Sequence, residues 1–156
     1  MAEQDYRLRP CTEADHDFCW EIRIDSYRAY VERLWGWDEA WQRARFEKNM
    51  KDQTIHRRLI ERDGEAIGLL ELTCAEAVTN IKNIQVMSTS QGAGIGTQVM
   101  RGLMADAREA GKDVSLQVFM SNPRAWALYE RLGFKETGRS ATHVHMRWVC
   151  PTDQQD

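Results

Sequence analysis

Residues 91–97 read Gln-Gly-Ala-Gly-Ile-Gly-Thr and lie between a candidate strand at 81–86 and a candidate helix that begins near Gly94. Glycines allow positive backbone φ and let a ligand approach the chain closely. Several N–H groups can then point into one cavity at a helix N-terminus, an arrangement that suits phosphates. The 18 residues from Asn83 to Met100 carry no charged side chain. Backbone N–H groups and the helix dipole would therefore have to hold any phosphate bound here.

Two other glycine-rich phosphate motifs do not fit this spacing. A P-loop requires Gly-Lys-Ser/Thr, and the segment has no lysine. A dinucleotide-binding fingerprint that starts at Gly92 needs glycine at its sixth position, where Thr97 stands. A glycine-rich turn without any ligand is the alternative that the spacing alone leaves open.

Hydrophobic periodicity on both sides of this segment predicts helices and strands in mixed order. Thr12–Asp15 has the form of a capping box and opens a helix that Gly36 ends, and Asp38 caps a second helix that runs to about Met50. Asp63-Gly64 is a two-residue hairpin signal. Strands are expected near 6–8, 55–62, 66–74, 81–86, 114–119, 134–138 and 142–149, with helices over 94–110 and from Pro123 to Gly133. This order predicts an α/β or α+β sheet with helices packed on it.

The composition is that of one ordinary, slightly acidic domain: 156 residues with a net charge of 21 − 24 = −3. Such a charge gives no general attraction for nucleic acid or an anionic membrane, and the first residues show no signal-peptide pattern. We expect a single domain over residues 1–156 with a short tail at its end. No C-x-x-C pair occurs, which favours free thiols and a cytoplasmic setting; the cysteines are Cys11, Cys19, Cys74 and Cys150.

Two motifs in the chain resemble those of the GCN5-related N-acetyltransferases, the GNAT superfamily. Gln91-x-x-Gly94-x-Gly96 is similar to the family's Q/R-x-x-G-x-G/A motif. Residues 122–134, Asn-Pro-Arg-Ala-Trp-Ala-Leu-Tyr-Glu-Arg-Leu-Gly-Phe, resemble its N-x-x-A-x-x-L-Y-E-x-x-G-F block. The resemblance covers roughly residues 6–148. It implies a mixed, mostly antiparallel central sheet with splayed strands 4 and 5 and about four flanking helices.

The same resemblance implies a site for acetyl-CoA. The pantetheine arm would pair with the backbone of the strand at 81–86, and the pyrophosphate would sit on the loop. Asn122 would contact the pantetheine arm, and Tyr129 would stand near the thioester sulfur. The expected cofactor-binding residues are Ile84, Val86, Gln91, Gly92, Gly94, Ile95, Gly96, Thr97, Asn122 and Tyr129.

Acetyl transfer to an amine needs a neutral nucleophile, stabilisation of the carbonyl oxygen and a proton for the leaving thiolate. The Tyr129 hydroxyl is a candidate for that proton, because a phenol titrates near pH 10; packing in the core is the alternative. Glu71 is a candidate base within an apolar strand, or else a solvent-facing carboxylate on an edge strand. His143 is a second candidate base, with ordinary strand packing as the alternative.

Gln85 occupies a strand position where relatives with a similar tryptophan-rich N-terminus often have glutamate, and glutamine cannot take a proton. This departure motivates a non-catalytic acyl-CoA-binding sensor or interaction module as an alternative to an enzyme. Bulk water is a further proton acceptor. We expect no metal, because His143 and its neighbour His145 lack further ligands at a suitable spacing.

Aromatic and acidic side chains alternate around the two N-terminal helices, which in the GNAT fold cover the acceptor side. Aromatic faces with carboxylates suit a cationic amine, and helix packing is the alternative, which we favour for Trp41. The residues concerned are Tyr27, Tyr30, Glu32, Trp35, Trp37, Asp38, Glu39 and Trp41. The expected reaction is direct attack of a primary amine, from a small molecule or a peptide, on acetyl-CoA in a ternary complex. A longer acyl chain is a further alternative, and the protein is expected to be a monomer or homodimer.

Overall fold

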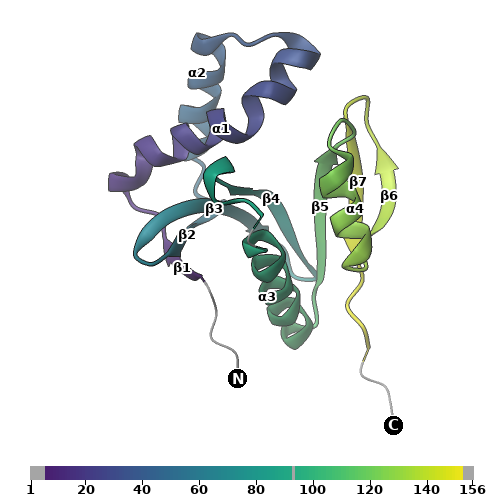
Figure 1. Cartoon of the computed structure of the whole chain (residues 1–156). Helices are drawn as coiled ribbons and strands as arrows, with labels where there is room; N and C mark the ends of the chain where they lie inside the picture. Colours follow the sequence, from purple (N-terminus) through teal and green to yellow (C-terminus); the bar gives the residue numbers. More distant parts are fainter. Residues whose placement is uncertain (1–5, 93, 153–156) are drawn as a thin grey trace. The chain divides into compact units, whose positions relative to one another are not determined.

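A computed structural model describes residues 6–92 and 94–152 of the chain, without the side chains of residues 26 and 27 (Figure 1). Tyr27, one of the candidate acceptor contacts, therefore has its side chain outside the described part. The helices and strands alternate nearly as the sequence predicts. They are β1 (Arg7–Pro10), η1 (Glu13–Asp15), α1 (His16–Trp35), α2 (Glu39–Met50), β2 (His56–Arg62), β3 (Glu65–Cys74), β4 (Val78–Val86), η2 (Ser88–Ser90), α3 (Ile95–Ala110), β5 (Asp113–Phe119), α4 (Pro123–Arg131), β6 (Lys135–Arg139) and β7 (His143–Trp148).

The strands form a seven-stranded sheet in the order β1-β2-β3-β4-β5-β7-β6. Most neighbours are antiparallel, whereas β4 and β5 run parallel to each other. The ladder between β4 and β5 runs from the pair Val78 and Asp113 to the pair Ile81 and Leu116, although both strands continue beyond it. The predicted fold class, a mixed and mostly antiparallel sheet with flanking helices, is confirmed.

The chain folds as two compact units that exchange segments. Of the described residues, the first unit comprises 6–71, 83–92, 94 and 95, and the second comprises 72–82 and 96–152. Strands β3 and β4 therefore contribute residues to both units. The expectation of one domain over the whole chain stays a prediction.

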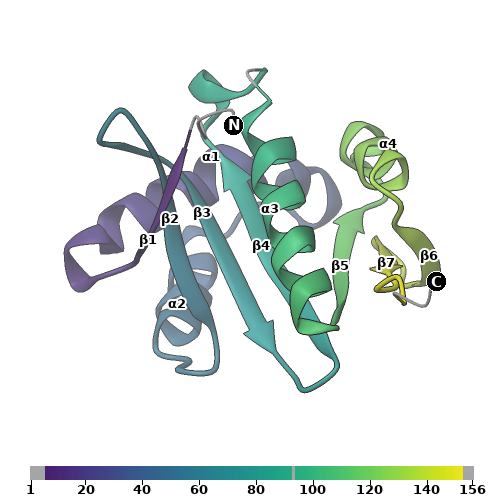
Figure 2. The same ribbon diagram turned by 90° about the horizontal axis from the view of Figure 1, so that it is seen from below.

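In the first unit, α1 and α2 cover one face of the strands (Figure 2). The core on this face consists of Cys19, Ile22, Phe46, Leu59 and Leu69. Gly36 ends α1 with a φ of 79°, and the Asp38 carboxylate caps α2 by accepting a hydrogen bond of 3.0 Å from the Trp41 N–H. The hairpin between β2 and β3 turns at Asp63 and Gly64, whose φ values of 53° and 80° suit a type I′ turn. These local signals were all readable from the sequence.

In the second unit, β5 and β7 supply a layer of buried apolar side chains. Leu116 lies opposite Met146 and Val118 opposite Val144, and all four are buried. Helix α4 lies beside β5, β6 and β7 in both views (Figures 1 and 2). Helix α3 buries one stripe, at Ile95, Val99, Met100, Leu103 and Ala107, with the spacing of three and four residues typical of an amphipathic helix.

Strand β4 begins earlier than the sequence predicted, at Val78 instead of Ile81. Among the residues added at its start, Asn80 is polar and finds partners on the neighbouring strands. The Ser115 hydroxyl donates a 2.8 Å hydrogen bond to Asn80 Oδ1, and Asn80 Nδ2 donates one of 3.4 Å to Thr73. A hydrophobic pattern could not detect this part of the strand, because cross-strand hydrogen bonds stabilise it in place of apolar burial.

Candidate active site

The loop between β4 and α3 has the backbone geometry that its glycines predict. Gly92 and Gly94 have φ values of 92° and 77°, in the left-handed region that favours glycine. The Gln91 side-chain amide donates a 2.8 Å hydrogen bond to the Val86 carbonyl and so fastens the loop to the end of β4. Residue 93 lies outside the described part of the chain.

Gly96 differs from the other two glycines in an informative way. It lies in the first turn of α3 without a positive φ, so its backbone does not require glycine. A Cβ atom built there would meet no atom within 4 Å, so packing does not require glycine either. Glycine inside a helix costs roughly 1 kcal/mol relative to alanine. Close approach of a ligand to the backbone is the physical reason that fits this residue.

The N-terminus of α3 offers backbone donors to such a ligand. The N–H groups at the start of an α-helix, here those of residues 95–97, have no partner within the helix. The first turn contains no acidic residue to compete for them. Thr97 adds a hydroxyl in this turn. The segment therefore has a backbone arrangement that suits phosphates, and its role in binding one stays a prediction.

On β4, the side chains alternate as predicted, but with an inverted polarity. Asn83 and Gln85 are buried, with 9% and 5% exposed, whereas Ile84 and Val86 are half-buried. A strand that buries its amides and leaves its apolar side chains partly exposed is unusual for a stable core. This inversion is consistent with the predicted role of the second half of β4 in binding a ligand, which stays a prediction.

The Gln85 amide has no hydrogen-bond partner for Oε1 or Nε2 among the described residues, and both atoms are buried. An unsatisfied buried polar group costs about 1–3 kcal/mol. The neighbouring Asn83 instead donates a 3.1 Å hydrogen bond to Glu71 Oε1. Of the two buried amides on β4, Asn83 is hydrogen-bonded, whereas the polar atoms of the Gln85 side chain have no partner in the described part of the chain.

Glu71 lies in a buried ion pair. Its Oε2 accepts a 2.6 Å hydrogen bond from Arg57 Nε, and each side chain is 8% exposed. Arg57 also donates to the carbonyl and the side chain of Asn49. The carboxylate therefore does not face solvent, and each of its oxygens is engaged, one by Arg57 and the other by Asn83. The sequence analysis missed Arg57, although it lies in phase with the buried Leu59 on β2, as Glu71 does with Leu69 on β3.

Tyr129 lies on α4, in the second unit. The helix begins where Asn122 Oδ1 accepts a 3.2 Å hydrogen bond from the Ala125 N–H, with Pro123 at the first helical position. The Tyr129 ring meets Phe134 edge to face at 5.9 Å. Burial raises the pKa of Tyr129 to about 12. The phenol is therefore protonated at neutral pH and is suited to donating a proton rather than accepting one.

His143 lies at the start of β7, also in the second unit. Its ring packs against Phe119 at 4.3 Å, and its Nδ1 lies 2.8 Å from the Thr142 hydroxyl. Burial, and then the charge of His145, lower the pKa of His143. The imidazole is therefore neutral near pH 7 and able to accept a proton. His145 shares its face, opposite Gln117.

The aromatic residues around the α1–α2 turn are more exposed than packing would require. Trp35 is 63% exposed and Trp41 is 54% exposed, so the packing interpretation of Trp41 is wrong. The Arg45 guanidinium lies 5.3 Å from the Trp41 ring, an arrangement that needs no burial. Trp37 donates a 2.7 Å hydrogen bond to Glu39. Its ring also lies 5.4 Å from the guanidinium of Arg28, which pairs with Glu32.

A contact that the sequence did not reveal joins α1 to the end of β4. Asp25 accepts hydrogen bonds of 2.8 Å from both the N–H and the hydroxyl of Ser88. The pairing spans 63 residues of sequence, so no local pattern could have found it.

Within residues 6–92 and 94–152, no cluster of three His, Cys, Asp or Glu side chains could hold a metal ion. In the same ranges, no helix is long and apolar enough to cross a membrane.

Comparisons with known proteins find similar sequences and similar folds. An aminoalkylphosphonate N-acetyltransferase of Salmonella typhimurium is 28% identical over 99 residues, which are 59% of this chain and 64% of that relative. The chain thus matches somewhat less than two thirds of that relative's length.

Solved structures show the same fold at low identity. PaiA N-acetyltransferase from Thermoplasma acidophilum in complex with coenzyme A has a TM-score of 0.76 at 16% identity, covering 92% of this chain and 98% of that one. Spermidine N-acetyltransferase from Vibrio cholerae in complex with CoA and spermine has a TM-score of 0.71 at 19% identity, covering 95% and 97%.

The family model described as "Acetyltransferase (GNAT) family" matches residues 16–134 of the chain. This range takes in the glycine loop, strand β4 and the whole of helix α4. The resemblance drawn from the two sequence motifs is therefore confirmed, and the chain belongs to the GNAT family of acetyltransferases.

Proposed function

We propose that the protein is an N-acetyltransferase that transfers the acetyl group of acetyl-CoA to a primary amine by direct attack in a ternary complex. The observation that carries this proposal is Gly96, a glycine that neither the backbone nor the packing of the helix requires. Membership of the family supports acetyl transfer as the reaction class. Coenzyme A in the PaiA and spermidine N-acetyltransferase structures supports the choice of cosubstrate.

The residues fit the anionic part of acetyl-CoA. Backbone N–H groups of the loop and of the first turn of α3 would hold the pyrophosphate, with Gln91 keeping the loop against the end of β4. The half-buried strand residues Ile84 and Val86 would offer backbone groups to the pantetheine arm. Asn122 uses its side-chain oxygen to cap α4, so its Nδ2 is the atom left for the same arm.

When bound, acetyl-CoA supplies an activated carbonyl with a thiolate leaving group. The neutral amine attacks this carbonyl, the bond between carbon and sulfur breaks, and the nitrogen loses a proton. Tyr129 is protonated over the whole physiological pH range, so its hydroxyl is the proposed donor to the departing sulfur.

The proton lost by the nitrogen needs an acceptor. Glu71 is a poor choice, because a carboxylate bound by Arg57 and Asn83 is stabilised where it is. We assign it a positioning role for β4 instead. His143 is neutral at pH 7, and in the tautomer whose Nδ1–H donates to the Thr142 hydroxyl, Nε2 is the nitrogen that can accept the proton, beside bulk water.

Gln85 is the proposed contact for the amine. Its buried Oε1 has no partner in the described part of the chain and can accept a hydrogen bond from the amine N–H. An amide orients the nucleophile without taking its proton. At pH values where His143 is neutral, the rise of the rate with pH should then follow the pKa of each amine substrate.

Two measurements test the proposal together. Calorimetry with CoA measures binding, and thiol release from acetyl-CoA measures turnover against a panel of amines. Replacing Tyr129 by phenylalanine should lower kcat at least tenfold while CoA affinity stays unchanged. Tight CoA binding without turnover on any amine would favour the non-catalytic module, and absence of CoA binding would contradict both functions.

The acceptor class is proposed from the relatives. The names of two relatives indicate two kinds of small amine for the panel: aminoalkylphosphonates, which are anionic, and spermidine, which is polycationic. Both compounds present a primary amine, so the acetylated group would be a primary amine nitrogen with either substrate. A protein that acetylates only peptide N-termini would contradict the small-amine assignment.

A further inference from the structure

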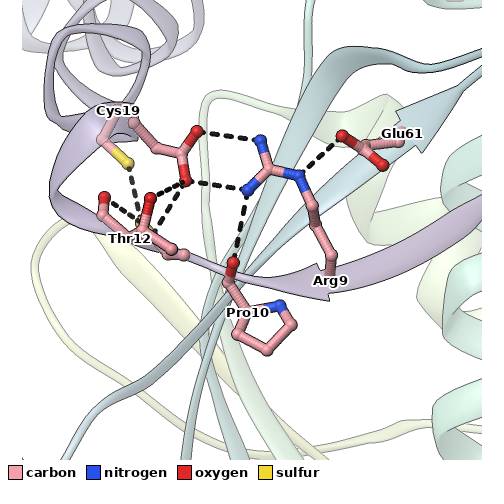
Figure 3. Close-up of polar contacts among 7 residues, drawn as sticks. Arg9, Pro10, Thr12, Cys19 and Glu61 are labelled. Carbon is pink, nitrogen blue, oxygen red and sulfur yellow. Dashed lines mark hydrogen bonds and ion pairs between the residues drawn. The ribbon is translucent and has the colours of Figure 1, made fainter.

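The turn between β1 and α1 holds two thiols in contact. Cys11 follows β1 directly, Cys19 lies in the second turn of α1, and their sulfur atoms are 3.7 Å apart. Figure 3 draws this turn, with the sulfur of Cys19 directed toward the chain at Thr12. All four cysteines are free thiols, and the Cys150 thiol donates to the carbonyls of Arg108 and Pro151 instead of meeting another thiol.

Charged groups fix the segment that carries the pair. Arg9 donates two hydrogen bonds of 2.8 Å to Asp15, one to each carboxylate oxygen, and one of 2.6 Å from Nε to Glu61 (Figure 3). Asp15 in turn accepts a 2.8 Å hydrogen bond from the Thr12 N–H. The Cys11 N–H donates to the Arg57 carbonyl at 3.1 Å. The backbone on both sides of Cys11 is therefore held in place.

The two thiols differ in access and in charge. Cys11 is only half-buried, whereas Cys19 is 1% exposed and belongs to the core beneath α1. The contact with the Cys19 thiol holds the pKa of Cys11 below its ordinary value. The same contact, together with burial, raises the pKa of Cys19. Cys11 is thus the more reactive sulfur, since the thiolate is the nucleophile.

We propose that Cys11 and Cys19 form an oxidation site, in which a peroxide oxidises Cys11 and Cys19 closes the disulfide. The Cys11 thiolate attacks one peroxide oxygen, which breaks the O–O bond and gives a sulfenic acid and hydroxide, or an alkoxide from an organic peroxide. The Cys19 sulfur then attacks the Cys11 sulfur, the S–O bond breaks, and water leaves with the Cys19 proton. The sulfur atoms must approach from 3.7 Å to about 2.05 Å.

The test uses the whole protein and hydrogen peroxide. Thiols are counted in denaturant with Ellman's reagent before and after exposure, and tryptic peptides are mapped without reduction. We expect a loss of two titratable thiols, a mass lower by two hydrogens, and one peptide pair that joins Cys11 to Cys19. Dithiothreitol should restore both thiols. No loss of thiols, or a disulfide that contains Cys74 or Cys150, would overturn the proposal.

Variants separate the two roles. Cys19→Ser should leave Cys11 as a sulfenic acid that dimedone labels, whereas Cys11→Ser should leave Cys19 unmodified in the folded protein. Cys74→Ser is the matched control and should still lose two thiols. Equal dimedone labelling of Cys11 and Cys74 in the Cys19→Ser variant would contradict a special reactivity of Cys11. The wild-type measurement stands alone if a variant does not fold.

Discussion

The loop at 91–96 and the turn between β1 and α1 differ in whether their polar groups have partners within the protein. In the turn, Arg9, Asp15 and Glu61 satisfy one another, and even the Thr12 N–H has a carboxylate partner. In the loop and the adjoining β4, polar groups are left for something else: the first N–H groups of α3 have no helical partner, and the Gln85 amide has none in the described part of the chain. The first region therefore maintains the fold, whereas the second has polar groups that are available to a ligand.

The largest expected effect is the loss of the guanidinium in the turn. Arg9→Met leaves the Asp15 and Glu61 carboxylates without their shared cation, and neither of them is fully exposed. Removing one partner of a buried pair costs about 3–5 kcal/mol, and we expect about 3 here because Arg9 is partly exposed. Urea unfolding measures the loss, and Arg9→Lys should recover part of it. Unchanged stability, with weaker CoA binding, would reverse the comparison between the two regions.

The same turn predicts how stability depends on pH. The hydrogen bonds that Arg9 donates are the main reason why the pKa of Asp15 lies below its ordinary value. A carboxyl whose pKa is depressed by folding stabilises the protein above its ordinary pKa of about 3.9, and this contribution is lost as pH falls toward the folded pKa. Asp15→Asn should therefore cost about 2 kcal/mol at pH 7. The difference from wild type should shrink below pH 4, as measured by urea unfolding across pH. A gap that stays constant down to pH 2 would contradict the ion pair.

These two regions also differ in how well sequence could predict them. The loop glycines, the Asn122 cap of α4 and the alternation of β4 were all predicted, because each is a local pattern of a few residues. The ion pair between Arg57 and Glu71 was not, since it depends on which strands lie side by side and in which register.

Other long-range polar contacts could not be predicted either, because they too depend on which segments the fold brings together. Asp25 and Ser88 are 63 positions apart, and nothing in either segment indicates the other. The exposure of Trp41 was missed because a helix pattern identifies an apolar position without saying whether a neighbour covers it. The roles of the candidate catalytic residues Tyr129, His143 and Glu71 stay predictions.

Gln85 gives a prediction in which stability and function move in opposite directions. Gln85→Met keeps the length of the side chain and removes the buried amide that lacks a partner. The free protein should become more stable by about 1–2 kcal/mol in urea unfolding, because the desolvation cost of the amide disappears. The KM for the amine should rise several-fold, while CoA affinity stays the same. Asn83→Leu is the matched control on the same face, and it should lower stability because Glu71 loses a donor.

If Gln85→Met lowers stability and leaves KM unchanged, the amide is a structural group that water satisfies. Turnover by the wild type would then still support the acetyltransferase, so the two proposals fail separately. Gln85→Glu extends the test to pH. A carboxylate at this position should add a protein-borne pKa to the rate profile, whereas the wild-type profile should move with the pKa of the amine.

The smallest effect expected is also the one that bears most directly on the loop. Gly96→Ala adds one methyl group where the helix has room for it and where alanine stabilises a helix by up to about 1 kcal/mol. The protein should be as stable as wild type or more so, yet CoA affinity should fall roughly fivefold, about 1 kcal/mol, because the methyl group occupies the approach to the backbone. Gly138→Ala on β6 is the matched control, since a Cβ there also meets no atom within 4 Å. Calorimetry with CoA should distinguish the two variants. If both variants bind CoA like wild type, ligand approach does not explain the glycine at position 96, and the proposal that this loop binds the pyrophosphate is contradicted.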